Sequence, residues 1–190
     1  MKRELHERRR SEARVAMLEH LWNRHKTQSP DLGETAPEIS LEAIEGGRFV
    51  LTGAAKKGPT VIVFFKVSCS TCQFTFPFLE RIHSAYRDQP VNFRAISQDD
   101  AQLSVQFARH YGVTFPIAVD PPPYAASRSY HFANVPTILL VDRERVVLFR
   151  NTGFSKAGLI RLSEEIAKLL GREPAPVFLA NEAVPETKPG

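Results

Sequence analysis

Two cysteines, the only ones in the chain, lie two residues apart in the segment Cys69-Ser70-Thr71-Cys72. The apolar run before them, residues 61–65, predicts a buried strand, and the stretch after them predicts a helix. The turn between the two would place Cys69 at the N-terminus of that helix, where unpaired backbone N–H groups stabilise a thiolate. Cys72, about one turn further on, would be partly buried and close enough to form a small disulfide with Cys69. The pattern predicts a redox dithiol in which Cys69 attacks and Cys72 resolves.

The same two cysteines could instead be structural thiols or half of a metal site. A tetrahedral zinc site needs further ligands, but His83, His110 and His131 are isolated and no second cysteine pair is present. With 43% hydrophobic residues and thirteen Phe, the chain has enough apolar material to form a core without a disulfide. We therefore favour redox chemistry, with no metal and no organic cofactor.

Several charged side chains follow the predicted strands. Lys66 comes three residues before the first cysteine, where a cation could favour the thiolate, but a solvated lysine at a strand end is the simpler interpretation. Asp99 precedes Gln102 by three residues and resembles a capping box that opens a helix. Asp100 and Asp120 fit caps and turns. We assign no acid–base or metal role to the three aspartates.

The net charge of the chain is concentrated at its N-terminus. Residues 1–28 carry eight Lys and Arg against four Glu, a balance of +4, which equals the net charge of the whole chain. The remainder is electrically balanced, so it gives no sign of a nucleic-acid footprint or of an acidic substrate. The basic start lacks the apolar run of a secretory signal, and the run 61–65 is too short to span a bilayer. We expect a soluble, cytoplasmic protein that binds neither nucleic acid nor membrane.

Helical and extended patterns divide the chain into three parts. Residues 1–28 predict an amphipathic helix that packs on its own domain or, as a homodimer contact, on a second copy. Residues 32–170 predict an α/β domain with a central mixed sheet flanked by helices. Residues 171–190 contain four prolines and little apolar pattern, which predicts a loosely ordered tail. The expected strands are a hairpin within 37–51 and runs at 60–66, 91–96, 117–120, 137–141 and 146–150; the expected helices follow the cysteines to about 87 and cover 99–111, a short segment ending at 130, and 155–170.

Three features between residues 32 and 170 resemble the thioredoxin superfamily, in particular the branch of TlpA-like thiol-disulfide oxidoreductases and AhpC/TSA peroxiredoxin-related proteins. The first is the Cys-x-x-Cys motif where a strand meets a helix. The second is Pro77, five residues after the second cysteine, where thioredoxins carry a helix-kinking proline. The third is Val135-Pro136-Thr137, which resembles the family's cis-proline loop. The resemblance implies a thioredoxin-like fold and a cis Val135–Pro136 bond that faces the dithiol, where a substrate chain pairs with the backbone.

The chain also departs from the family. Thioredoxins usually have Trp before the first cysteine and Gly-Pro between the two, whereas this chain has Ser68 and Ser70-Thr71. The position of the buried acid of general thioredoxins holds Val63, and that of the glutamate common in TlpA-like proteins holds Thr75. Proton transfer to and from the second cysteine must therefore use water, Thr71, Thr75 or another group.

The resemblance implies a thiol-disulfide oxidoreductase that exchanges electrons with a protein dithiol or disulfide and is recharged by an unidentified redox partner. The first alternative is a hydroperoxide-reducing enzyme of the AhpC/TSA type. The peroxiredoxin motif Pro-x-x-x-Thr-x-x-Cys is absent in either cysteine frame; with Cys69 in the cysteine position, Lys66 holds the place of the threonine. The second alternative is a non-catalytic binding module that docks a partner through residues 1–28 and the groove at Pro136.

Overall fold

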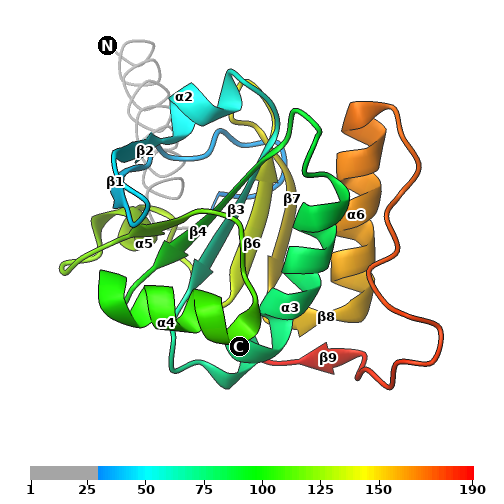
Figure 1. The fold of residues 1–190 in the computed structure, drawn as a ribbon. Coiled ribbons are helices and arrows are strands. Elements are labelled where there is room, and N and C mark those ends of the chain that lie inside the picture. Colours follow the sequence, from blue (N-terminus) through cyan, green and yellow to red (C-terminus); the bar gives the residue numbers. More distant parts are fainter. Residues whose placement is uncertain (1–29) are drawn as a thin grey trace, which may run out of the picture.

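The computed structural model describes residues 30–190. The helix expected over residues 1–28, and the homodimer contact through it, lie outside the described residues. Within that range the main sheet has seven strands in the order β2-β1-β5-β4-β3-β6-β7 (Figure 1). The strands of this sheet are β1 (Ser40–Ala43), β2 (Arg48–Val50), β3 (Thr60–Phe65), β4 (Asn92–Ser97), β5 (Ile117–Val119), β6 (Thr137–Val141) and β7 (Val147–Thr152). A separate two-stranded sheet consists of β8 (Phe154–Ser155) and β9 (Thr187–Lys188). The helices are α2 (Leu51–Ala55), α3 (Ser70–Ala85), α4 (Ala101–Tyr111), α5 (Ala125–Ser129) and α6 (Lys156–Leu170).

The sheet is mixed, as the sequence predicts. Strands β3, β4 and β5 run parallel to one another, while β6 and β1 join this group by antiparallel pairing. The hairpin of β1 and β2 turns at Gly46 and Gly47, whose φ angles of 96° and 77° suit glycine. A second hairpin joins β6 to β7. The order of elements therefore predicts a mixed sheet, and the structure supplies the order of its strands.

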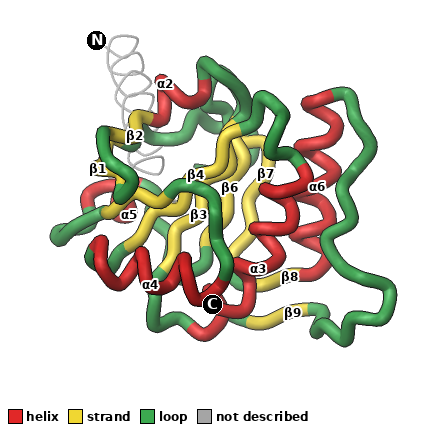
Figure 2. Tube along the Cα trace, viewed as in Figure 1, coloured by secondary structure: helices red, strands yellow, loops and turns green. Residues whose placement is uncertain are grey.

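Helices cover both faces of the sheet (Figure 2). One core contains side chains from α3, α4 and α6, and the other contains side chains from α2, α5 and the segment before β1. Strand β3 lies between the two cores, because its odd-numbered valines and Phe65 enter the first and its even-numbered Ile62 and Phe64 enter the second. All six residues of β3 are buried. This central strand gives the residues that follow it a rigid base.

Residues 171–190 pack on the domain, which differs from the loosely ordered tail that their prolines predict. Val177 is 4% exposed, and the Phe178 ring lies 5.0 Å from the Phe78 ring on α3. Arg81 on α3 forms an ion pair with Glu182 at 2.6 Å, and β9 pairs with β8. The apolar residues of this segment that pack on the domain, such as Val177 and Phe178, do not recur with the period of a helix or a strand. The sequence pattern therefore does not predict this packing.

Among the described residues, no helix combines the length and the apolar composition needed to cross a membrane.

Candidate functional site

The dithiol lies where β3 leads into α3. Cys69 is the N-cap residue of α3, as the sequence predicts, and its Sγ accepts a hydrogen bond from the Cys72 backbone N–H at 3.1 Å. This N–H is one of the donors that lack a partner within the helix, and the start of a helix favours negative charge. Cys69 is half-buried, whereas Cys72 is fully buried. An incoming sulfur atom can therefore reach Cys69 and not Cys72.

Cys72 belongs to the core beneath α3. It shares that core with Phe76 and Leu79 of the same helix. Burial, with a further contribution from the hydrogen bond to Cys69, raises the pKa of the Cys72 thiol well above its ordinary value. The Cys72 thiol therefore stays protonated at neutral pH, and it can act as a nucleophile only after it loses that proton.

Raising the pH is expected to destabilise the reduced protein through Cys72. The raised pKa means that the folded protein keeps a proton that the unfolded chain releases as the pH rises above about 8.5. Because the unfolded state then binds fewer protons, the free energy of unfolding falls with rising pH. Urea unfolding at pH 7 and pH 10 under reducing conditions measures this loss. Cys72→Ala removes the thiol and should lose less stability over the same interval; an equal loss in both proteins would contradict the assignment.

The loop before β6 faces the dithiol. The Val135–Pro136 peptide bond is cis, which confirms the expectation for this loop. Cys69 Sγ donates a hydrogen bond to Val135 O at 3.3 Å, and Pro136 is buried beside it. The carbonyl before the proline and the half-buried sulfur are thus adjacent, although 66 positions separate their residues.

The structure places the remaining predicted site residues around the dithiol. Within residues 30–190, no side-chain hydrogen bond joins Lys66, Thr75 or Pro77 to Cys69 Sγ, whereas the Cys69 N–H donates to Lys66 O at 3.2 Å. Lys66 directly follows β3 and has an exposed side chain, in keeping with a solvated lysine at the end of a strand. The Thr75 hydroxyl donates to Thr71 O at 2.7 Å within α3, and the Thr71 hydroxyl donates to Pro189 O. Pro77 lies inside α3, as expected. A proton path through either threonine stays a prediction.

Two side chains to which the sequence analysis assigns no role at the dithiol, Asp99 and Gln73, hold the turn before the first cysteine. Asp99 Oδ2 accepts from the Val67 N–H at 2.6 Å, and Gln73 Nε2 donates to Val67 O at 2.9 Å. The capping role predicted for Asp99 is wrong, because Asp100 is the N-cap of α4 and accepts from the Leu103 N–H at 2.8 Å. Residues 32 positions apart form the Asp99 contact, so no local pattern predicts it.

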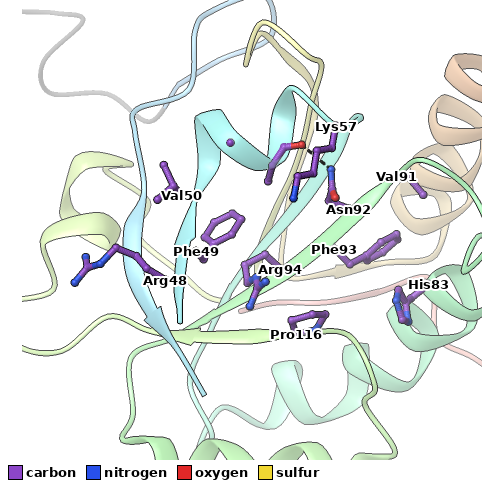
Figure 3. Close-up of a pocket in the computed structure, with 12 residues that line it drawn as sticks. Arg48, Phe49, Val50, Lys57, His83, Val91, Asn92, Phe93, Arg94 and Pro116 are labelled. Carbon is purple, nitrogen blue, oxygen red and sulfur yellow. Dashed lines mark hydrogen bonds between the residues drawn. The ribbon is translucent and has the colours of Figure 1, made fainter. Parts of the chain in front are cut away.

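A hollow of about 450 Å³ lies near the N-terminal ends of β3 and β4, away from the dithiol (Figure 3). Arg48, Lys57, His83 and Arg94 line it, and the Arg94 guanidinium lies 4.7 Å from the centre of the Phe49 ring. Neither cysteine contributes to this hollow. Within residues 30–190, no three His, Cys, Asp or Glu side chains gather in a way that could hold a metal ion.

Comparison with known proteins identifies the family. The model of the AhpC/TSA family matches residues 32–150. The thiol-disulfide oxidoreductase ResA of Geobacillus thermodenitrificans is 30% identical over 113 residues, covering 59% of this chain and 64% of that protein. ResA of Halalkalibacterium halodurans is 27% identical over 137 residues, covering 72% of this chain and 77% of that protein. The chain thus spans less than two thirds of the length of the first of these relatives.

Solved structures identify the fold. A structure from Chlorobium tepidum, named for the thiol:disulfide interchange protein DsbE, matches with a TM-score of 0.67 and 26% identity, covering 75% of this chain and 100% of that one. The thioredoxin domain of a thiol-disulfide oxidoreductase from Bacteroides vulgatus matches with a TM-score of 0.64 and 20% identity, covering 72% and 98%. The domain therefore has the thioredoxin-like fold that the three sequence features imply.

Proposed function

We propose, from the premise that this chain belongs to the AhpC/TSA family, that it is a thiol-disulfide oxidoreductase acting through Cys69 and Cys72. The observation that carries the proposal is the half-buried Cys69 sulfur at the N-cap of α3, between the Cys72 N–H and Val135 O, with Cys72 buried behind it. The names of the two ResA relatives agree with this chemistry.

The reaction proceeds by two exchanges of sulfur bonds. The Cys69 thiolate attacks one sulfur of a substrate disulfide, which forms a mixed disulfide and releases the other substrate sulfur as a thiolate. Cys72 loses its proton and attacks the Cys69 sulfur, which forms the Cys69–Cys72 disulfide and releases the second substrate thiolate. Two electrons pass from the dithiol to the substrate, and the released thiolates take up two protons. The reverse sequence oxidises a substrate dithiol, and a separate dithiol or disulfide protein restores the starting state.

The N-terminus of α3 supports the first step, because helix N–H groups stabilise negative charge on the attacking sulfur. The cis-proline loop supports substrate binding, since Val135 O lies beside that sulfur and an extended chain can pair with such a backbone. Peroxide reduction has less support. Lys66, which holds the place of the peroxiredoxin threonine, has an exposed side chain.

Mixing the reduced protein with one equivalent of a disulfide-containing peptide tests the proposal. We expect the peptide to be reduced while the protein loses the mass of two hydrogen atoms as its two cysteines join. A parallel reaction with one equivalent of hydrogen peroxide distinguishes thiol-disulfide exchange from hydroperoxide reduction. Oxidation at the rate of an ordinary thiol supports disulfide exchange, whereas rapid oxidation by peroxide with no exchange would overturn the proposal in favour of peroxide reduction.

Replacing Asp99 is expected to slow exchange with the peptide by about tenfold or more, because a misplaced attacking group loses orientation. Asp99→Ala removes the acceptor of the Val67 N–H and loosens the turn before Cys69. Asp100→Ala is the matched control, since it removes the neighbouring carboxylate and the cap of α4. That control should cost about 1 kcal/mol of stability with little change in exchange rate. Equal exchange rates in the two variants would show that Asp99 does not position the turn.

A further inference from the structure

The C-terminal segment 186–190 lies across residues 69–72, the N-cap and first residues of α3, which we call the dithiol loop. Lys188 Nζ donates to Ser70 O at 3.3 Å, and Thr71 Oγ1 donates to Pro189 O at 2.5 Å. Ser70 and Thr71 are the two residues between the cysteines. In Figure 1 the end of the chain, after β9, lies beside the first turn of α3. The segment therefore contacts the dithiol loop itself.

The same segment reaches the cis-proline loop. A side-chain carbon at Gly190 would lie 2.5 Å from Val135 O and 3.3 Å from Asn134 Cβ, so the backbone of residue 190 packs directly on this loop. Val135 O is also the atom to which Cys69 Sγ donates its hydrogen bond. The end of the segment and the attacking sulfur thus share one carbonyl as a neighbour.

Strand β9 keeps the segment extended. It pairs antiparallel with β8, which places Lys188 opposite Phe154. The Lys156 N–H donates to Glu186 O at 2.9 Å. Proteins often bind a peptide as an extended chain laid against exposed backbone, and residues 186–190 lie in this way beside Val135 O. The segment thus occupies the place where a polypeptide substrate would approach Cys69.

We propose that residues 186–190 act as an internal ligand of the groove formed by Val135 and the dithiol loop, and that a polypeptide disulfide must displace them. The expected effect of the segment on disulfide exchange rests on the proposed function. The two side-chain hydrogen bonds to the dithiol loop are each of modest net strength, so a competing strand can replace the segment. The segment slows exchange with polypeptide disulfides more than exchange with small disulfides, which need less of the groove.

Removing residues 187–190 tests the inference. The shortened chain keeps Val177 in the core and the ion pair between Arg81 and Glu182. We expect kcat/KM to rise severalfold for a disulfide-containing peptide and to change less for hydroxyethyl disulfide. Gly190→Val keeps the full length and should act in the same direction, because its side chain would collide with the cis-proline loop. Leu179→Ala, at a 62% exposed position in the same tail, is the control.

Two outcomes separate this inference from the proposed function. If neither the full chain nor the shortened chain exchanges any disulfide, the proposed function fails. A peptide-binding experiment then tests the inference by itself. A fluorescent peptide with the sequence of residues 182–190 should bind the shortened chain and not the full chain. No binding to the shortened chain, or a peptide kcat/KM that stays equal or falls on shortening, overturns the inference.

A separate hollow of about 660 Å³ adjoins Lys66, whose carbonyl accepts the hydrogen bond from the Cys69 N–H. Lys66, Arg128 and His131 line this basic hollow, and no carboxylate does. Lys66 follows β3, whereas Arg128 and His131 come from α5 and the turn directly after it, so only the fold brings Lys66 to the other two. The fold therefore creates a positively charged surface next to the dithiol.

Two further features mark the basic hollow as a binding site. Ser127, which is 5% exposed, lines it, and its Oγ has no hydrogen-bond partner among the described residues. A buried hydroxyl without a partner is costly and is rare in folded proteins. Tyr124 and His131, which also line it, have φ angles of 59° and 46°, in the left-handed region that is uncommon for a bulky residue such as Tyr124. Backbone conformations of this kind cluster where a ligand binds.

From this second observation we infer that the basic hollow takes a carboxylate of the substrate polypeptide, so that disulfides flanked by Asp or Glu are preferred. This inference rests on the proposed function and adds a substrate preference to it. Two disulfide peptides that differ only in Glu against Gln beside the cysteine provide the test. We expect kcat/KM to be about fivefold to tenfold higher for the Glu peptide, with the preference fading as salt screens the charges. Arg128→Glu should abolish the preference, whereas Arg109→Glu, exposed on α4 outside the hollow, should keep it.

Equal rates for the Glu and Gln peptides in the native protein overturn this second inference while leaving the proposed function intact. If neither peptide is reduced, the proposed function fails, and binding of a Glu peptide with Ser in place of its cysteines decides the inference. Binding must then be tighter than that of the matched Gln peptide and must weaken in Arg128→Glu. Equal binding of the two peptides excludes a carboxylate site.

Discussion

Replacing Cys69 by serine is expected to reduce the rate of disulfide exchange by more than about a thousandfold, because the hydroxyl is a far weaker nucleophile than a thiolate at neutral pH. The structure gives the reason for assigning the attack to this sulfur, since Cys72 is fully buried and Cys69 is half-buried. Stopped-flow mixing of each reduced variant with a disulfide peptide measures the rate. Ser68→Ala, at the exposed position before Cys69, is the control and should react at close to the native rate.

Cys72→Ser gives the complementary result. The first exchange should proceed, because Cys69 and its helix N-cap position are intact, but the mixed disulfide should persist. Mass spectrometry would show the protein plus one peptide half, which added dithiothreitol releases. A Cys69→Ser protein that still forms a mixed disulfide through Cys72 would reverse the two roles and contradict the burial argument.

Replacing Phe76 by alanine is expected to cost about 3–5 kcal/mol of stability, the usual effect of removing a large ring from a core. Phe76 is fully buried, and its ring lies 4.6 Å from Phe65 and 4.9 Å from Phe107. It therefore connects α3 to the strand before the dithiol and to α4. Because Cys69 is the N-cap of α3 and Cys72 lies in its first turn, we also expect slower disulfide exchange in the fraction that stays folded.

Urea unfolding of the reduced proteins measures this loss. Leu103→Ala on α4 is the matched control, because Leu103 is 42% exposed and its removal leaves no cavity. Such surface changes usually alter stability by about 0.5 kcal/mol or less. A loss below about 1 kcal/mol for Phe76→Ala would mean that the ring contacts between α3 and β3 do not anchor the helix.

The sequence predicts the main elements well where periodicity is strong. The run at β3, the hairpin turn at Gly46 and Gly47, and the end of α4 at Gly112 all appear close to their expected positions. The Cys-x-x-Cys spacing and the strand-to-helix junction are local properties, so residues near one another in the chain suffice to place Cys69 at an N-cap. The capping role of Asp99 is the local prediction that is wrong, because two adjacent aspartates compete for one cap.

Contacts between distant residues are decided by the tertiary structure alone. Nothing in the residues near Asp99 indicates its bond to Val67, and nothing in residues 171–190 indicates that this proline-containing segment packs on α3 and reaches the dithiol loop. The cis-proline loop was inferred from a family resemblance rather than from local pattern. By itself, the sequence determines which residues can carry out thiol chemistry, since two thiols at this spacing fit few other roles. Only the fold decides which sulfur is exposed and which side chains and backbone atoms surround it, because burial depends on packing between segments that are far apart in the chain.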